Sequence, residues 1–339
     1  MLINLGKWWG PKDMQPVLAI HGWQDNAGSF DTLSEILAEN IAILAIDIPG
    51  HGKWWGSKEV QPILALHGRQ DNAGSFDTLI PLLPYDVSVL CLDYPGHGFS
   101  SHYPQGQFYY VHWDGVILLR RIIKHFKWTK VKLLGHSLGG AIGFLYAAIY
   151  PDEVDCLISI DIASPCVRSL KKVVSITHTD IDRFLNYESM TLDSVPDYDY
   201  KEMMDIVENA YSGGITRKSA EILMKRGIQP SSEPGRFYFS RDSRLKTSFY
   251  GGVSLDVVLR FAQRITCAYL NIRAKPGIQF EEPEIYGQVL DVIKKTAVKF
   301  EYREVPGSHH VHLNNPERVA PIIEELYTLL DITIRRQKL

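Results

Sequence analysis

The chain has 339 residues, and its 36 Lys and Arg nearly balance 39 Asp and Glu, for a net charge of -3. With 45% hydrophobic and 22% charged residues, this is the composition of a globular protein, which excludes collagen-like, disordered and coiled-coil classes. No basic surplus points to nucleic acid or to an anionic membrane. The 4 cysteines are too few and too scattered for a disulfide framework, and no apolar run approaches the ~20 residues of a membrane span.

Two consecutive segments of the chain, residues 7–52 and 53–98, have similar sequences. They share 28 of 46 positions, including the unbroken run QDNAGSFDTL. Each copy reads as a strand, a Gly-bearing loop, a helix and a second strand, and the predicted strands are 17–20, 41–48, 63–66 and 86–94. One sheet needs only one such unit. We therefore predict a tandem duplication in which residues 1–52 are the surplus copy.

Strands and helices continue to alternate after the repeat. The predicted elements are a helix in 108–126, a strand at 131–134, a helix at 138–150, strands at 154–161, 265–272 and 298–305, a helix around 282–295 and a last helix from Pro316. This order predicts an α/β fold with a mostly parallel sheet and helices on both faces. The helical, charge-rich segment 165–263 interrupts it as an inserted lid, which divides the core into residues 53–164 and 264–339.

The segment Gly135–Gly139 fits the pattern G-x-S-x-G. A buried strand runs into it and an apolar helix leaves it, which is the setting of a nucleophile elbow. Glycines are needed two residues either side of the nucleophile because side chains would collide in so tight a turn. Ser137 is therefore the candidate nucleophile.

A nucleophilic serine of this kind needs two backbone N–H donors for the oxyanion that forms during acyl transfer. The first is predicted to be Leu138, directly after the nucleophile. The second is predicted to be Arg69, in the loop after the strand 63–66. The alternative is Trp23, its counterpart in the first copy. We expect His67 and His21, which precede these donors, to bond the loop backbone.

A general base must follow the nucleophile along the chain, and the segment GSHHVH supplies three histidines. His309 lies 7 residues before Pro316, where the last helix is predicted to begin, and is the preferred base. His310 and His312 are the alternatives. A cluster of histidines also suggests a metal site. Because no acidic or Cys residue lies close to it in the sequence, no metal is expected.

The acid that orients the base has two candidate positions. Residues 273–277, directly after the strand 265–272, contain no carboxylate. Asp161 closes the strand 154–161 and is the preferred acid. Glu281 and Glu282 lie later, at the start of a predicted helix, and are the alternative.

The motifs HGxQDNAGSFD, DxPGHG, GHSLGG and PGSHHVH together resemble the α/β-hydrolase superfamily. More closely, they resemble the serine hydrolase-like proteins of animals, from about residue 53 to the C-terminus. The resemblance implies an α/β-hydrolase fold, with Ser137 as the nucleophile and His309 as the base. The chain departs from the family pattern in its tandem copy, in Arg69 where the first copy has Trp23, and in the near absence of the first strands before KWWG.

These observations predict a serine hydrolase that needs no cofactor and cleaves an ester or a related acyl bond of a small apolar substrate. The alternative is a catalytically weak or inactive binding protein on the same fold. We expect a cytoplasmic protein. A peroxisomal pool is the alternative, because the C-terminal Gln337-Lys338-Leu339 resembles the S-K-L address.

Overall fold

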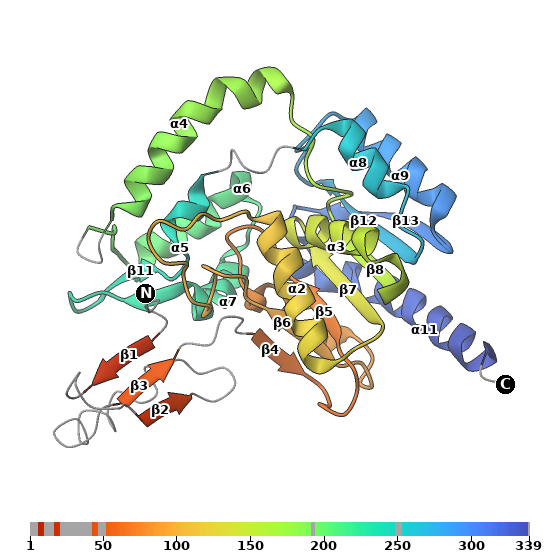
Figure 1. Cartoon of the computed structure of the whole chain (residues 1–339), viewed down its shortest axis with the longest axis horizontal. Coiled ribbons are helices and arrows are strands. Elements are labelled where there is room, and N and C mark those ends of the chain that lie inside the picture. The colour runs from red at the N-terminus through yellow and green to blue at the C-terminus, as the bar shows by residue number, and fades with distance from the viewer. Residues whose placement is uncertain are drawn as a thin grey trace.

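The structure, a computed structural model, describes residues 6–9, 17–20, 43–46, 52–190, 194–247 and 253–337. Its central sheet has 7 strands in the order β13-β12-β8-β7-β5-β6-β4 (Figure 1). Their bounds are β4 Gly52–Trp55, β5 Ile63–Leu66, β6 Val89–Leu92, β7 Val131–His136, β8 Val154–Ile160, β12 Ala268–Pro276 and β13 Lys299–Gly307. Only β4 pairs antiparallel with its neighbour in this sheet, so the predicted mostly parallel sheet is confirmed.

Successive side chains of a strand point to opposite faces of the sheet, and helices cover both faces. On one face, Leu64 and Leu90 belong to a buried cluster with side chains of α2 (His112–Phe126), α3 (Leu138–Ile149), α8 (Leu255–Ala262) and α9 (Pro283–Thr296). On the other face, Ile63 and Val89 pack with side chains of α11 (Ala320–Gln337). Within the described part of the chain, no helix combines the length and apolar character needed to cross a bilayer.

Two predicted helices differ from the structure. The helix expected after β5 is replaced by two 3₁₀ turns, Ala73–Phe76 and Ile80–Leu82. Pro81 and Pro84 explain this, since proline has no N–H to donate along a helix. The last helix begins at Ala320 rather than at Pro316, after the short helix α10 (Val311–Asn314) and a 3₁₀ turn that Pro316 opens.

The segment between β8 and α8 contains most of the expected lid. Its helices are α4 (Leu170–Glu188), α5 (Tyr200–Glu208), α6 (Ala210–Gly213) and α7 (Arg217–Gly227). It also contains an antiparallel sheet of β9 (Tyr198–Asp199), β10 (Ile228–Pro230) and β11 (Arg236–Phe239). These strands were not expected, because they are short and half-buried and so form no apolar run. α8 falls within the expected lid segment but packs against α3 and α9 of the core.

The first repeat copy forms a separate three-stranded sheet, drawn in red at the lower left of Figure 1. Its strands are β1 (Gly6–Trp9), β2 (Val17–Ile20) and β3 (Ile43–Ile46). β3 pairs antiparallel with β1 and parallel with β2, as β6 does with β4 and β5. The registers also match: Gly6 lies opposite Ile46, and Gly52, 46 residues later, lies opposite Leu92. The second copy supplies strands to the central sheet.

A version of the protein lacking residues 7–52 is expected to be at least as soluble and as active as the full chain. The deletion joins Gly6 to Lys53 and restores the sequence GKWW of β4, so the central sheet keeps all of its strands. The lost sheet has two short edge strands, β1 and β2, which offer unpaired backbone groups to other chains. Soluble yield and turnover of an activated ester, each per mole of protein, check this. Lower values for the shortened chain would show that the first copy is needed.

Candidate active site

Ser137 lies in a tight turn between β7, which ends at His136, and α3, which begins at Leu138. Its backbone has φ 50° and ψ -118°, a conformation that residues with a side chain rarely adopt. The glycines of the motif make this turn possible. A Cβ atom on Gly139 would overlap the carbonyl oxygen of Leu66 in β5, and one on Gly135 would overlap the backbone of the following helix. The turn therefore has the shape that the motif predicts.

Ser137 lines a mostly apolar cavity of about 340 Å³. Leu138 and Ala141 of α3 form part of its wall, and Arg69 lies in the loop that follows β5. Residues between β8 and α8 also line the cavity, among them Ala210 of α6. A substrate bound here would lie against the serine.

His309 and Asp161 contact one another although 148 residues separate them in the sequence. His309 Nδ1 lies 2.7 Å from Asp161 Oδ2, and both side chains are buried. Asp161 directly follows β8, and its N–H donates to Ile272 O of the neighbouring strand β12. Its second carboxylate oxygen accepts a hydrogen bond of 3.0 Å from the N–H of Ala274. Asp161 is thus held in place by β8, which it follows, and by hydrogen bonds to the neighbouring strand β12.

Neither of the alternative acids contacts His309 in the hydrogen bonds and ion pairs of the described residues. Glu281 Oε2 accepts a 2.9 Å hydrogen bond from the N–H of Val167. Glu282 takes the N-cap position of α9. Of the three carboxylates proposed from the sequence, the structure brings Asp161 to the histidine.

The charge state of the pair follows from burial and from its neighbours. Burial lowers the pKa of His309 well below its usual range, and the nearby His136 and His310 lower it further. A buried imidazole is therefore neutral at rest and able to accept a proton. Burial raises the pKa of Asp161 to about 7, against the opposing effects of Arg273 and the Ala274 N–H.

His136, the first variable residue of the G-x-S-x-G motif, connects the Ser137 turn to His309. Its Nε2 donates a 2.9 Å hydrogen bond to the carbonyl oxygen of His309. Its ring centroid lies 4.6 Å from that of His309 and 4.0 Å from that of His312. The sequence pattern alone gave this histidine no predicted role. The available signal was a polar residue at the end of an otherwise apolar strand.

The two alternative bases have other partners. His310 Nε2 lies 3.2 Å from a carboxylate oxygen of Asp71, and His136 Nδ1 lies 3.6 Å from the same oxygen. His312 packs against Phe76, with ring centroids 5.2 Å apart. An acidic residue lies beside the histidines in space, although none lies close to them in the sequence, because β5 and β7 are adjacent and bring Asp71 to them.

The ligand atoms of Asp71, His136 and His310 lie within 4.8 Å of one another, a spacing that a metal ion also requires. Electrostatic attraction between the Asp71 carboxylate and the two histidines also explains why these three side chains lie together. Burial alone would raise the pKa of Asp71, but His310 and His136 hold it well below its usual range. The cluster therefore pairs a buried carboxylate with two histidines directly behind the base.

The predicted oxyanion donors flank the cavity. Leu138 is the first residue of α3, where backbone N–H groups have no acceptor within the helix. Arg69 lines the cavity beside it. The structural role expected of His67 is confirmed, since its Nδ1 donates to Gly68 O at 2.7 Å and its Nε2 accepts from the Tyr94 N–H at 3.2 Å. His21 and Trp23 lie outside the described residues.

The side chain of Arg69 joins the cavity to the lid. Its Nη2 donates hydrogen bonds of 2.7 Å to Leu245 O and 2.6 Å to Thr247 O. These carbonyls belong to the 3₁₀ turn Ser243–Lys246 and the residue after it. The position of Arg69 therefore depends on how this turn is held.

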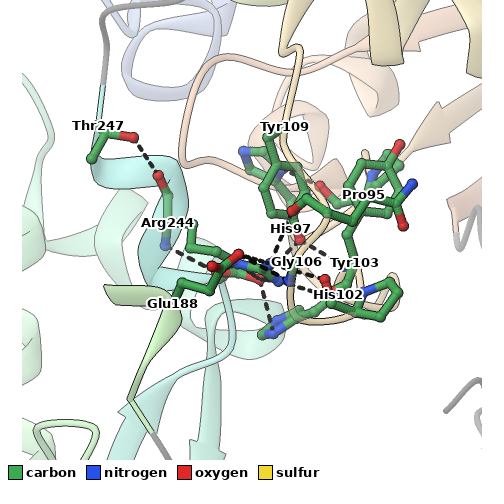
Figure 2. Close-up of polar contacts among 12 residues, drawn as sticks. Pro95, His97, His102, Tyr103, Gly106, Tyr109, Glu188, Arg244 and Thr247 are labelled. Atoms are coloured by element: carbon green, nitrogen blue, oxygen red, sulfur yellow. Dashed lines mark hydrogen bonds and ion pairs between the residues drawn. The ribbon is translucent and has the colours of Figure 1, made fainter. Parts of the chain in front are cut away.

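Arg244 holds that turn against the loop that precedes α2 (Figure 2). Its guanidinium donates to the carbonyl oxygens of Tyr103, Pro104 and Gln107 and to the carboxylate of Asp242. Asp242 in turn accepts a 2.9 Å hydrogen bond from the Tyr109 hydroxyl. Arg244 and Asp242 are buried, so each satisfies a polar group that water does not reach.

Replacing Arg244 by Met is expected to lower the free energy of unfolding by about 3–5 kcal/mol, because Asp242 would remain as a buried charge that has lost its arginine and keeps only the half-exposed His102 at 3.5 Å. Chemical denaturation measures this. Arg217→Met is the control, since Arg217 and its partner Asp205 form an ion pair of 3.3 Å in which both side chains are exposed. Such pairs contribute about 0–1 kcal/mol. Equal losses in the two variants would contradict the role given to Arg244.

The parallel sheet, the serine turn and the histidine loop together define an α/β-hydrolase. A family model described as alpha/beta hydrolase fold matches residues 61–191. A solved structure of a hypothetical protein from Pseudomonas aeruginosa aligns with a TM-score of 0.71 and 27% identity, covering 82% of this chain and 95% of that one.

Relatives among known proteins narrow the class. A probable serine hydrolase of Drosophila melanogaster is 50% identical over 94% of this chain and 82% of its own length. A serine hydrolase-like protein of Danio rerio is 32% identical over 94% of this chain and 83% of its own length. The chain belongs to the serine hydrolase-like family of the α/β-hydrolase superfamily.

Proposed function

We propose that the chain is a serine hydrolase that cleaves an ester or a related acyl bond through an acyl-enzyme intermediate. Ser137 is the nucleophile, His309 the general base and Asp161 the acid that orients it. The observation that carries the proposal is the 2.7 Å contact between His309 Nδ1 and Asp161, because it leaves the other ring nitrogen as the proton acceptor. The strained turn of Ser137 and the adjoining cavity support it.

In the proposed mechanism, Ser137 Oγ attacks the carbonyl carbon of the substrate while His309 Nε2 takes the hydroxyl proton. The carbonyl oxygen becomes an oxyanion, for which the N–H groups of Leu138 and Arg69 are the proposed donors. Collapse of this intermediate breaks the bond to the leaving group, which receives the proton from His309. Water then attacks the acyl-enzyme with His309 again as base, which releases the acid and restores the serine.

The surroundings of the base suit this sequence of steps. Burial keeps the His309 imidazole neutral before attack. The carboxylate of Asp161 stabilises the imidazolium that forms when the serine proton is transferred. Because the cavity beside Ser137 is mostly apolar and has a volume of about 340 Å³, the proposed acyl group is small and largely apolar.

An active-site serine probe tests the proposal. A fluorophosphonate forms a covalent bond only with an activated serine, so we expect the full chain to be labelled on Ser137 and the Ser137→Ala variant not to be. Peptide mapping identifies the labelled residue. A folded protein that is not labelled, and that does not hydrolyse p-nitrophenyl esters of graded chain length, would favour the binding-protein alternative.

A further inference from the structure

Two arginines line the cavity that contains Ser137. Arg69 follows β5, and Arg168 follows β8 by way of the loop that begins at Asp161. Among the described residues of the cavity wall there is no Asp or Glu. Arginine keeps its charge at every pH that a protein tolerates. The described lining residues are therefore mostly apolar, with two arginines and no carboxylate among them, and the nearby Glu281 acts on Cys166 of the wall from outside it.

Both charges act on the same residue of the cavity wall. His112 belongs to the same wall, and its pKa is lowered to about 4, first by burial and then by the charges of Arg69 and Arg168. A single imidazole thus lies within the field of both guanidinium groups. At neutral pH it is uncharged and adds no further cation.

The guanidinium of Arg69 is held in a fixed position. Its two hydrogen bonds to Leu245 O and Thr247 O tie it to the turn that Arg244 fastens. A preorganised charge binds a complementary ligand without a large cost of ordering. The first repeat copy has Trp23 at the matching position, so the charge belongs only to the copy that lines this cavity.

We propose that this cavity accepts an acyl substrate that carries a carboxylate, with Arg168 and Arg69 as the residues that recognise the anion. The apolar wall would contact the hydrocarbon part of such a molecule, and the arginines its charged group. The proposal rests on the proposed function, because it places the anion in the cavity of the nucleophile Ser137. The substrate inferred above has a small, largely apolar acyl group, and we now propose that the same molecule also carries a negative charge.

Matched esters test the charge preference with the full chain. Mono-p-nitrophenyl adipate and p-nitrophenyl hexanoate differ by a carboxylate on the acyl side, and 3-carboxy-4-nitrophenyl butyrate and p-nitrophenyl butyrate differ by one on the leaving group. We expect kcat/KM to be about tenfold or more higher for the charged member of one pair, which is the effect of a charge-assisted hydrogen bond. A preference in the first pair would place the anion on the acyl side of the substrate, and a preference in the second pair would place it on the leaving group. High salt should reduce the preference.

Variants of Arg168 identify the residue responsible. In Arg168→Gln, we expect the ratio of kcat/KM for the preferred charged ester to that for its neutral partner to fall about tenfold. Arg168→Lys should retain part of the ratio, because it keeps the charge but not the planar fork. Lys171→Gln is the control, since it removes an exposed cation of α4 and should leave the ratio unchanged. An unchanged ratio in Arg168→Gln would overturn the proposal.

A binding measurement separates this proposal from the proposed function. In the Ser137→Ala variant, calorimetry should give a lower Kd for adipate than for hexanamide. Adding Arg168→Gln should abolish the difference between the two Kd values. This result would support the charged site even if the chain hydrolyses no ester. Conversely, hydrolysis without any preference for charged esters, together with equal binding of the two ligands, would contradict only the charged site.

Discussion

His309→Ala is expected to lower kcat for an activated ester by about 10³-fold or more, the scale on which loss of a catalytic triad member acts. The reason is that Ser137 would have no base to take its proton. His309 has the position for this task, because its Nδ1 is engaged by Asp161 and its carbonyl is held by His136. Turnover of p-nitrophenyl butyrate per mole of folded enzyme measures the loss.

The neighbouring histidines supply the controls for this prediction. His310→Ala and His312→Ala should retain most of the turnover, since His310 contacts Asp71 and His312 packs against Phe76. Both residues are buried, so their replacement is expected to lower stability, and folded protein must be quantified by circular dichroism. Near-normal turnover in His309→Ala would show that the base has been assigned to the wrong histidine.

The sequence predicts those features that depend on steric overlap between neighbouring residues and on the burial of apolar side chains. The apolar-rich segments at 131–134 and 154–161 form interior strands, because short segments of this kind occupy the buried centre of a parallel sheet. The turn at Ser137 follows from Gly135 and Gly139, since any side chain there would overlap the backbone of the helix or of β5.

Contacts between segments that are distant in the sequence cannot be predicted from local patterns of residues. Asp71 and His310 are 239 residues apart, and they meet only because β5, β7 and the histidine loop share one edge of the sheet. The lid strands β9 and β11 were missed for a related reason. β9 has 2 residues and β11 has 4, too few to show the alternation typical of strands, so only their pairing in space identifies them, although Phe237 and Phe239 of β11 pack on a buried apolar cluster of the lid.

The acid was left open in the sequence because its position depends on strand register. Asp161 directly follows β8 and the candidates Glu281 and Glu282 precede α9, so all three lie near the same edge of the sheet. Only the pairing of β8 with β12, which places Ile160 opposite Ile272, determines which carboxylate reaches His309.

Asp161→Asn is expected to preserve the fold and to lower kcat by about 10²–10⁴-fold. The side-chain carbonyl of asparagine can still accept the hydrogen bond from the Ala274 N–H. It cannot stabilise the imidazolium, and an amide group facing His309 Nδ1 favours the wrong tautomer. Steady-state kinetics with p-nitrophenyl butyrate should show the loss in kcat rather than in KM.

The pH profile gives a second measurement of the same variant. Burial raises the pKa of Asp161 to about 7, and the pair is active only without an added proton, so kcat/KM of the full chain should fall as pH decreases through about 7. Asparagine does not titrate, and losing an anion lowers the pKa of the neighbouring imidazole. The acidic limb of Asp161→Asn should therefore move to lower pH. Glu281→Gln and Glu282→Gln are the controls and should keep the normal rate and profile. A large loss in Glu281→Gln with normal turnover in Asp161→Asn would reverse the assignment of the acid.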